Sequence, residues 1–308
     1  MGADGLLVAA EEGAGRVVQI GASGTITPLL AGLASPEGVA VDAAGTLYVV
    51  EDTADGRLIQ RTAEGITTTL ATGLDAPEGV VVVPAHNRVY VTESNLQLLP
   101  ANPTLADIQA LRSHVTAVEL TAPYTVTRLI TTTPTLNVIS FTGHFVSLGG
   151  LAERDGLLYA SNELGGLEII TTTNVPGIPF PVTVTFLSPE GILRLDPLAS
   201  DPPSTLTTFA TGLITPEGLR FGTDGSFPLL AAEEDISGAQ QNDVGRLSEV
   251  SAGGAAVPLC TGLLGVEDVL RTADGRIFLS EDSSGYLIQL APPVVAPSWV
   301  IYLPLVVK

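Results

Sequence analysis

A phrase of the sequence that recurs along the chain limits the possible folds more than any other feature. The clean copy occupies residues 36–58, opens with Pro-Glu-Gly and ends in an acidic pair followed by Gly-Arg-Leu. The next copy opens at Pro77, a period of 41 residues, which lies within the range of known structural repeats. Later copies open at Pro216 and Val266, and a degenerate copy opens at Leu148. The fold must therefore be built from similar units that pack on one another.

Each unit predicts four β-strands. Two apolar runs that alternate with smaller or more polar residues, 39–41 and 47–50, flank Asp-Ala-Ala-Gly at 42–45. That tetrapeptide suits a hairpin turn, because glycine tolerates positive φ and aspartate bonds to its own backbone. A third run follows Gly56, and a threonine-rich fourth run covers 66–70. Four-stranded antiparallel units with this period indicate an all-β, six-bladed β-propeller.

The six units are not equally complete. The first lacks its innermost strand, because residues 7–12, 16–20 and 25–30 match only the second, third and fourth strands. Residues 190–191 imitate another Glu-Gly start, but 192–195 fit a third strand, so we interpret that start as a false copy. We expect one domain, residues 1–308, with insertions at 96–112 (of short helical period), 134–146 (a connection) and 164–187 (which could form a hairpin).

The end of the chain is an apolar strand, residues 299–307. An exposed apolar strand promotes aggregation, and pairing with the first or last blade would bury it. Because a propeller needs its seam locked, we predict that this C-terminal strand closes the ring. The alternative is a sorting or anchoring tail, which it resembles in some exported bacterial proteins.

Charge excludes one class of partner. The formal net charge is −20 and the only lysine is Lys308, whereas nucleic-acid binding needs clustered basic residues. Small cations, or substrates bound through a cation, fit better. Cys260 is the only cysteine, so no intrachain disulfide can form. No apolar run reaches the roughly 18 residues of a membrane-spanning helix, and we expect a monomer that binds a small-molecule substrate or ligand.

The first residues, Met-Gly-Ala-Asp-Gly, have neither a basic segment nor an apolar segment of the kind found in signal peptides. This start predicts either a cytoplasmic protein or an exported one whose signal peptide has been removed. We favour the second, secreted or periplasmic, location.

An acidic residue recurs at the end of the second strand in five of the six units, with an amide in the fourth. Strict repetition of this kind is typical of a structural device, so we expect these acids mainly to accept backbone N–H groups from the neighbouring blade. The following position is also mostly acidic. The first set is Glu11, Glu51, Glu93, Asn162, Glu233 and Glu281; the second is Glu12, Asp52, Ser94, Glu163, Glu234 and Asp282.

Another set of glutamates opens the innermost strands. In a propeller these positions surround one mouth of the central channel, so we expect the four side chains to converge and raise one another's pKa. A bound divalent cation would relieve the repulsion, and hard oxygen ligands favour Ca²⁺ over Zn²⁺. The alternative is that they only brace the blades. The set is Glu37, Glu78, Glu217 and Glu267, with Gly149 as the exception.

The fourth unit departs from this symmetry. It has Gly149 in place of glutamate and Asn162 in place of the ring acid, and His144 and a long insertion lie nearby. A site usually breaks the symmetry that maintains a fold. His144 is therefore a candidate general base, although a lone histidine is more often a surface or packed residue. Ser147 and Ser161 have no visible triad partners.

The phrase at 36–52, Pro-Glu-Gly-Val-Ala-Val-Asp-Ala-Ala-Gly-Thr-Leu-Tyr-Val-Val-Glu-Asp, resembles the strand pairs of one group of six-bladed propellers. The group contains NHL repeats, SMP-30/gluconolactonases and strictosidine synthase-like proteins. SMP-30-like members hold a divalent cation, usually Ca²⁺, in the channel through Glu, Asn and Asp, and hydrolyse lactones or related esters. The likeness implies as metal ligands Glu37, Glu78, Asn162, Glu217 and Glu267, and we take as catalytic candidates Glu78, Glu217 and His144.

Two functions follow from these observations. The first is a metal-dependent hydrolase, in which the cation polarises a lactone or ester carbonyl and a channel carboxylate accepts a proton from water. The second is a non-catalytic, NHL-like propeller that binds a ligand or protein through the insertions at 96–112 and 164–187. We favour the hydrolase, because so many carboxylates at one mouth are costly to keep without a cation.

Overall fold

The structure is a computed structural model in which strands dominate. Its strands form seven sheets, and the helices are one short α-helix and three 3-10 turns within the described part of the chain. The helical elements are η1 (Pro84–His86), η2 (Leu96–Leu98), α1 (Leu105–Gln109) and η3 (Pro202–Thr205). The described residues are 6–98, 100, 103–137, 139–166, 168–173, 177–189, 191–234, 244–282, 284–290 and 301–303.

Four repeat units form four-stranded antiparallel sheets whose strands follow chain order, as predicted. Each opens with the strand that carries the Pro-Glu-Gly phrase or its variant. These sheets are β4 (Pro36–Val41), β5 (Leu47–Glu51), β6 (Gly56–Arg61) and β7 (Thr67–Leu74); β8 (Pro77–Val83), β9 (Arg88–Ser94), β10 (Ser113–Glu119) and β11 (Val126–Thr132); β20 (Pro216–Arg220), β21 (Leu229–Glu233), β22 (Gly245–Val250) and β23 (Ala256–Leu263); and β24 (Val266–Arg271), β25 (Ile277–Glu281), β26 (Tyr286–Leu290) and β27 (Ile301–Leu303).

The first and fourth units confirm two further predictions. The first has three strands among the described residues, β1 (Leu7–Glu11), β2 (Arg16–Ile20) and β3 (Ile26–Ala31). In the fourth unit, residues 192–195 form the third strand, where Arg194 lies opposite Tyr159. That sheet comprises β14 (Leu148–Arg154), β15 (Leu157–Asn162), β18 (Ile192–Leu195) and β19 (Thr207–Ala210).

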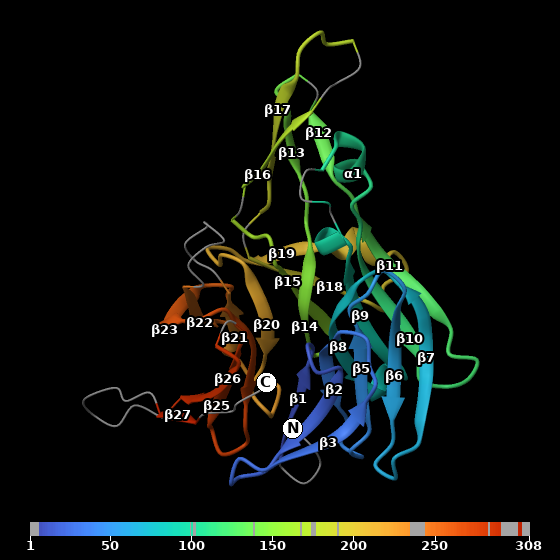
Figure 1. Ribbon diagram of the computed structural model, residues 1–308, viewed down its shortest axis with the longest axis vertical. Coiled ribbons are helices and arrows are strands. Elements are labelled where there is room, and N and C mark those ends of the chain that lie inside the picture. Colours follow the sequence, from blue (N-terminus) through green and yellow to red (C-terminus); the bar gives the residue numbers. More distant parts are fainter. Residues whose placement is uncertain are drawn as a thin grey trace.

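The seventh sheet corrects the interpretation of the insertions. Within 164–187 the predicted hairpin is present as an antiparallel pair in which Glu168 lies opposite Leu187. We expected 134–146 to be only a connection, but it contributes two strands to the same sheet, joined by a parallel pair in which His144 lies opposite Leu187. This sheet projects away from the others with α1 beside it (Figure 1). The predicted helical turn within 96–112 is present as α1. The strands are β12 (Thr135–Asn137), β13 (Thr142–His144), β16 (Glu168–Thr173) and β17 (Val182–Leu187), in the order β12-β13-β17-β16.

The C-terminal strand pairs with the last sheet, one of the two partners we expected. β27 lies antiparallel to β26, with Ile301 opposite Gln289, and occupies the outer edge of that sheet. It completes four strands there. It lies at the opposite edge from β24, so this pairing does not itself join the last sheet to the first, and closure of the ring by this strand stays a prediction. Residues 299–300 and 304–307 of the predicted strand lie outside the described residues.

Apolar cores form between consecutive sheets. Tyr90 on β9 and Leu158 on β15 share one cluster, and Val49 on β5 shares another with Val17 on β2. β1 of the first sheet and the innermost strands of the other five repeat sheets also contact one another, in the order β1, β4, β8, β14, β20 and β24. Each of the four middle sheets is therefore held by the sheets before and after it.

Glycine makes the closest of these approaches possible. A Cβ on Gly38 would lie 1.9 Å from the carbonyl oxygen of Glu78, and one on Gly150 would lie 2.2 Å from that of Glu217. Gly79 and Gly218 face the next innermost strand in the same way. The Gly of the Pro-Glu-Gly phrase is thus required for packing, and it places the glutamates of successive sheets side by side.

Candidate functional site

The acids at the ends of the second strands are here called the second-strand acids, and four of the five pair with an arginine of their own unit. Glu51 is buried and accepts hydrogen bonds from Arg57 Nη2 at 2.7 Å and from the backbone N–H of Ala34 at 2.9 Å. Burial raises the pKa of Glu51, but these donors outweigh it and leave that pKa below its ordinary value. The second-strand acids are Glu11, Glu51, Glu93, Glu233 and Glu281.

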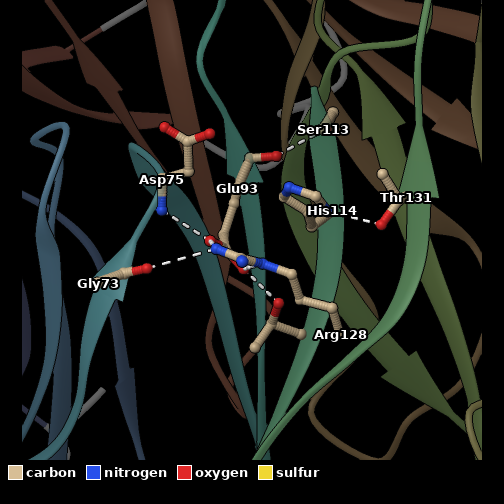
Figure 2. Close-up of polar contacts among 8 residues, drawn as sticks. Gly73, Asp75, Glu93, Ser113, His114, Arg128 and Thr131 are labelled. Atoms are coloured by element: carbon tan, nitrogen blue, oxygen red, sulfur yellow. Dashed lines mark hydrogen bonds and ion pairs between the residues drawn. The ribbon is translucent and has the colours of Figure 1, made fainter. Parts of the chain in front are cut away.

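Figure 2 shows the same arrangement around Glu93, which is fully buried. Its carboxylate accepts the backbone N–H of Asp75 at 2.7 Å, Nη2 of Arg128 at 2.9 Å and the hydroxyl of Thr116. Arg128 also donates to the carbonyl of Gly73, on the strand that precedes this sheet. The acid therefore ties the connection between two sheets to the strands of the second.

The second-strand acids of the remaining sheets make similar contacts. Glu233 accepts the N–H of Ile214 at 2.8 Å and pairs with Arg246 at 2.5 Å, and Glu281 accepts the N–H of Leu264 at 2.8 Å. Glu11 pairs with Arg16. These contacts confirm the structural role expected of this set.

The glutamates of the innermost strands, here called the inner acids, have opposite surroundings. Burial and the neighbouring carboxylates of Glu163, Glu37 and Glu217 raise the pKa of Glu78 well above its ordinary value. Burial, Glu163 and Glu267 raise that of Glu217 in the same way. The charges of these side chains therefore act on one another, while their convergence at one channel mouth stays a prediction. The inner acids are Glu37 on β4, Glu78 on β8, Glu217 on β20 and Glu267 on β24.

The other two inner acids lie nearer to solvent. Burial and Glu234 raise the pKa of Glu267 to about 8. Surrounding protein and then Asp52 raise that of Glu37 well above its usual value, although this side chain retains an exposed surface.

Glu163 is the site residue that the sequence interpretation left out. Its charge contributes to the raised pKa of every inner acid, and it hydrogen-bonds to Glu78 and accepts the hydroxyl of Ser147. The fourth unit thus supplies its acid from the residue directly after β15, not from the position of Gly149. The available signal was the acidic position after the second strand.

Gly149 leaves room for these side chains. A Cβ at Gly149 would lie 3.0 Å from Oε2 of Glu217, 3.3 Å from Oε2 of Glu163 and 3.3 Å from Oγ of Ser161. Two carboxylates and a buried hydroxyl therefore border one small space. This is where the structure places the loss of symmetry noted at the fourth unit.

Two candidates from the fourth unit are placed differently. Asn162 is buried, and its amide oxygen accepts the N–H of Ser147 at 3.0 Å while its amide nitrogen donates to Ser188 Oγ at 2.9 Å. One of the two lone pairs of its amide oxygen is therefore already engaged. His144 is exposed and lies on β13 of the projecting sheet, whereas the inner acids lie on the innermost strands of other sheets.

The inner acids suit a hard cation by their chemistry. They offer only oxygen donors, and their charges raise one another's pKa, which a cation would reverse. Within the described ranges, however, no three His, Cys, Asp or Glu side chains lie close enough to hold one ion. Cation binding would therefore need the carboxylates to turn toward a common point.

Comparison with known proteins rests on structure. No protein-family model and no curated protein sequence matches the chain. A gluconolactonase from Xanthomonas campestris superposes with a TM-score of 0.58 at 17% identity, covering 89% of this chain and 78% of its own. The chain has the fold of a gluconolactonase-like β-propeller. At such identity the likeness concerns the fold alone.

Other propellers of the same fold differ in chemistry. A streptogramin B lyase matches with a TM-score of 0.57 at 12% identity, over 99% of this chain and 81% of its own. A protein from Thermus thermophilus described as a putative glucose dehydrogenase matches with a TM-score of 0.55 at 16% identity, over 96% and 86%. The fold therefore leaves the reaction open. In the part of the chain that is described, no helix is long and apolar enough to span a membrane.

Proposed function

We propose that this propeller is a hydrolase that opens a lactone or ester among the inner acids. The observation that supports this proposal is that burial and the charges of Glu37, Glu78, Glu217, Glu267 and Glu163 on one another raise the pKa values of the four inner acids. Carboxyl groups that hold a proton near neutral pH are suited to general acid and base catalysis. The likeness in fold to a gluconolactonase is consistent with this reaction.

We also propose that the ring has six blades. The six sheets that contain the repeat units contact one another through their innermost strands, from β1 to β24. The seventh sheet comes from the insertions and projects from this set (Figure 1). In this arrangement the inner acids line one end of the channel.

The roles of the side chains follow from their surroundings. Glu78 is only 6% exposed and shares a hydrogen bond with Glu163, so it retains a proton and can donate it to the leaving oxygen. Glu217, which is less buried, can accept a proton as water attacks the carbonyl carbon. One C–O bond forms, the ring or ester C–O bond breaks, and the products are an acid and an alcohol. His144 remains a further candidate for the base.

A divalent cation, Ca²⁺ by its preference for oxygen, would be held by Glu37, Glu217 and Glu267 and by Glu78 once it has lost its proton, with Asn162 as a weaker candidate ligand. When bound, such an ion polarises a carbonyl and lowers the pKa of bound water. The protein's own contribution is to keep these carboxylates together.

The first experiment measures metal content of desalted protein and its melting temperature before and after EDTA. Near-stoichiometric calcium with a large fall in melting temperature supports the cation. Hydrolysis of a panel of lactones and aryl esters then tests the reaction. We expect Glu78→Gln and Glu217→Gln to lower kcat/KM by about 100-fold or more, while His144→Ala tests the other base. Glu64→Gln, at an exposed turn, is the control. Full activity in both channel variants would exclude this mechanism.

A second function is supported by the projecting sheet. We propose, as the alternative, that the protein is a non-catalytic, NHL-like propeller that binds a partner through this sheet. Large apolar side chains are exposed there, including Ile139 at 89%, Ile170 at 63% and Phe180 at 63%. Replacing Ile170 and Phe180 by serine should abolish binding and leave hydrolysis unchanged. Hydrolysis that is lost on chelation would instead support the enzyme.

A further inference from the structure

One buried oxygen in the first sheet lacks the partner that its counterparts have. Glu11 is 5% exposed and bonds to Arg16 through Oε2, but its Oε1 accepts no hydrogen bond from any described residue. A buried carboxylate oxygen without a donor is unfavourable. In four other sheets the equivalent acid accepts the N–H of the residue two positions before the innermost strand, namely Ala34, Asp75, Ile214 and Leu264.

The backbone N–H of the residue after each second-strand acid shows the same difference between the first sheet and the others. The N–H that follows the second-strand acid donates to the residue immediately before the innermost strand: Asp52 to Ser35 at 2.8 Å and Ser94 to Ala76 at 3.0 Å. The corresponding N–H of Glu12 has no such acceptor within the described part of the chain. β1 is also an edge strand, because it pairs only with β2 among the strands described.

We propose that the first sheet binds an extended segment of another polypeptide as a fourth strand beside β1, and that this segment carries the Pro-Glu-Gly phrase of the chain's own innermost strands. Strand addition to a free edge is an established mode of peptide recognition. The segment would supply an N–H to Oε1 of Glu11 and a carbonyl to the N–H of Glu12.

The geometry of the other sheets explains why the bound segment should carry the Pro-Glu-Gly phrase. The residue before the proline has a φ of 48° at Ser35 and 47° at Ala76, which sets the turn into the strand. The glycine then lies against the next strand, as Gly38 does against the carbonyl of Glu78. An incoming segment would place its glycine against β4 in the same way, and a larger residue would collide with the backbone.

The sixth sheet lies on the other side of the position that the added strand would occupy, and it limits the affinity for that strand. The sixth sheet has Asp268 at the position that corresponds to Gly38, Gly79, Gly150 and Gly218, each of which faces the following innermost strand. Asp268 Oδ1 folds back to accept the N–H of Val269 at 2.7 Å, but any Cβ at this position narrows the approach that glycine allows in the other sheets. We expect weak binding to the natural protein and tighter binding to Asp268→Gly.

The test uses a fluorescent peptide that copies residues 33–42, titrated into the protein and into Asp268→Gly while anisotropy is measured. We expect saturable binding that Asp268→Gly strengthens. N-methylation of the residue that copies Ala34 removes the donor to Glu11 and should weaken binding about tenfold or more. Alanine in place of the peptide's glycine should weaken it to a similar extent.

Both peptide changes leave the protein untouched, so misfolding cannot imitate their effects. Circular dichroism and the melting temperature of Asp268→Gly establish that this variant is folded. The absence of binding to both proteins would overturn the proposal. Binding that neither peptide change weakens would overturn it as well. Neither result depends on whether the protein hydrolyses lactones.

Discussion

The two sets of acids differ in what surrounds them, although both repeat with the blades. Glu51, Glu93 and Glu233 each bond to an arginine and to a backbone N–H. Glu78 and Glu217 lie among other carboxylates, whose charges raise their pKa values. Repetition therefore does not distinguish a structural acid from a chemical one, whereas the presence of a counter-charge within the same unit does.

The largest effect should come from removing a second-strand acid. Glu233→Ala removes the carboxylate that accepts hydrogen bonds from the half-buried guanidinium of Arg246 and from the N–H of Ile214. We expect the free energy of unfolding to fall by about 3–5 kcal/mol, as for other broken buried ion pairs. Urea denaturation measures it, with Glu64→Ala at an exposed turn as the control. A loss no greater than that of the control would contradict the structural role.

The next effect concerns the spacing of the inner acids. Gly150→Ala would bring a Cβ within 2.2 Å of the carbonyl of Glu217, so the two innermost strands must separate. We expect a loss of about 1–3 kcal/mol in unfolding free energy. Gly13→Ala is the matched control, because no atom lies within 4 Å of its added Cβ. Equal stability of the two variants would show that the close approach is unnecessary.

The inner acids should also make stability depend on pH. Their pKa values are raised in the folded protein, so the folded state binds more protons than the unfolded chain above the ordinary value of 4.5. Stability should therefore be greatest near pH 4.5–5 and fall as pH rises toward the value of about 8 for Glu267. Allowing for solvent screening, we expect a fall of roughly 1–3 kcal/mol, measured by urea denaturation with EDTA present.

Stability that instead rises steadily from pH 5 to 8 would show that the inner acids have ordinary pKa values. Glu267→Gln should flatten the profile, because it removes the titrating group with the value of about 8. Glu281→Gln, which alters a second-strand acid on the same sheet, should leave the slope in place while lowering stability at every pH.

The smallest predicted effect is a gain in stability. Glu217→Gln removes one of several like charges and, in the absence of metal, should stabilise the protein at pH 8 by about 0.5–1 kcal/mol. Differential scanning calorimetry with EDTA measures it. If the same substitution destabilises the protein when calcium is added, Glu217 has a cation as its counter-charge. The two sets of acids would then differ in the kind of counter-charge, which is an arginine in one set and a metal ion in the other.

The repeat was sufficient to predict most strands. Residues 7–12 and 192–195 were assigned to their positions in the unit from the pattern alone, because alternation and turn chemistry act over a few residues. The same reasoning located the inner acids, since equivalent positions in equivalent units must lie near one another around a common axis.

The sequence by itself determined the all-β repeat, its strands and the equivalent positions of Glu37, Glu78, Glu217 and Glu267. The tertiary structure alone decided that the two insertions share one sheet, because β13 and β17 pair across about forty residues of sequence. The tertiary structure also decided which acids have a basic partner. Arg128 reaches Glu93 from a strand 35 residues away and Glu163 replaces the acid missing at Gly149, and such contacts depend on side-chain direction, which no local pattern specifies.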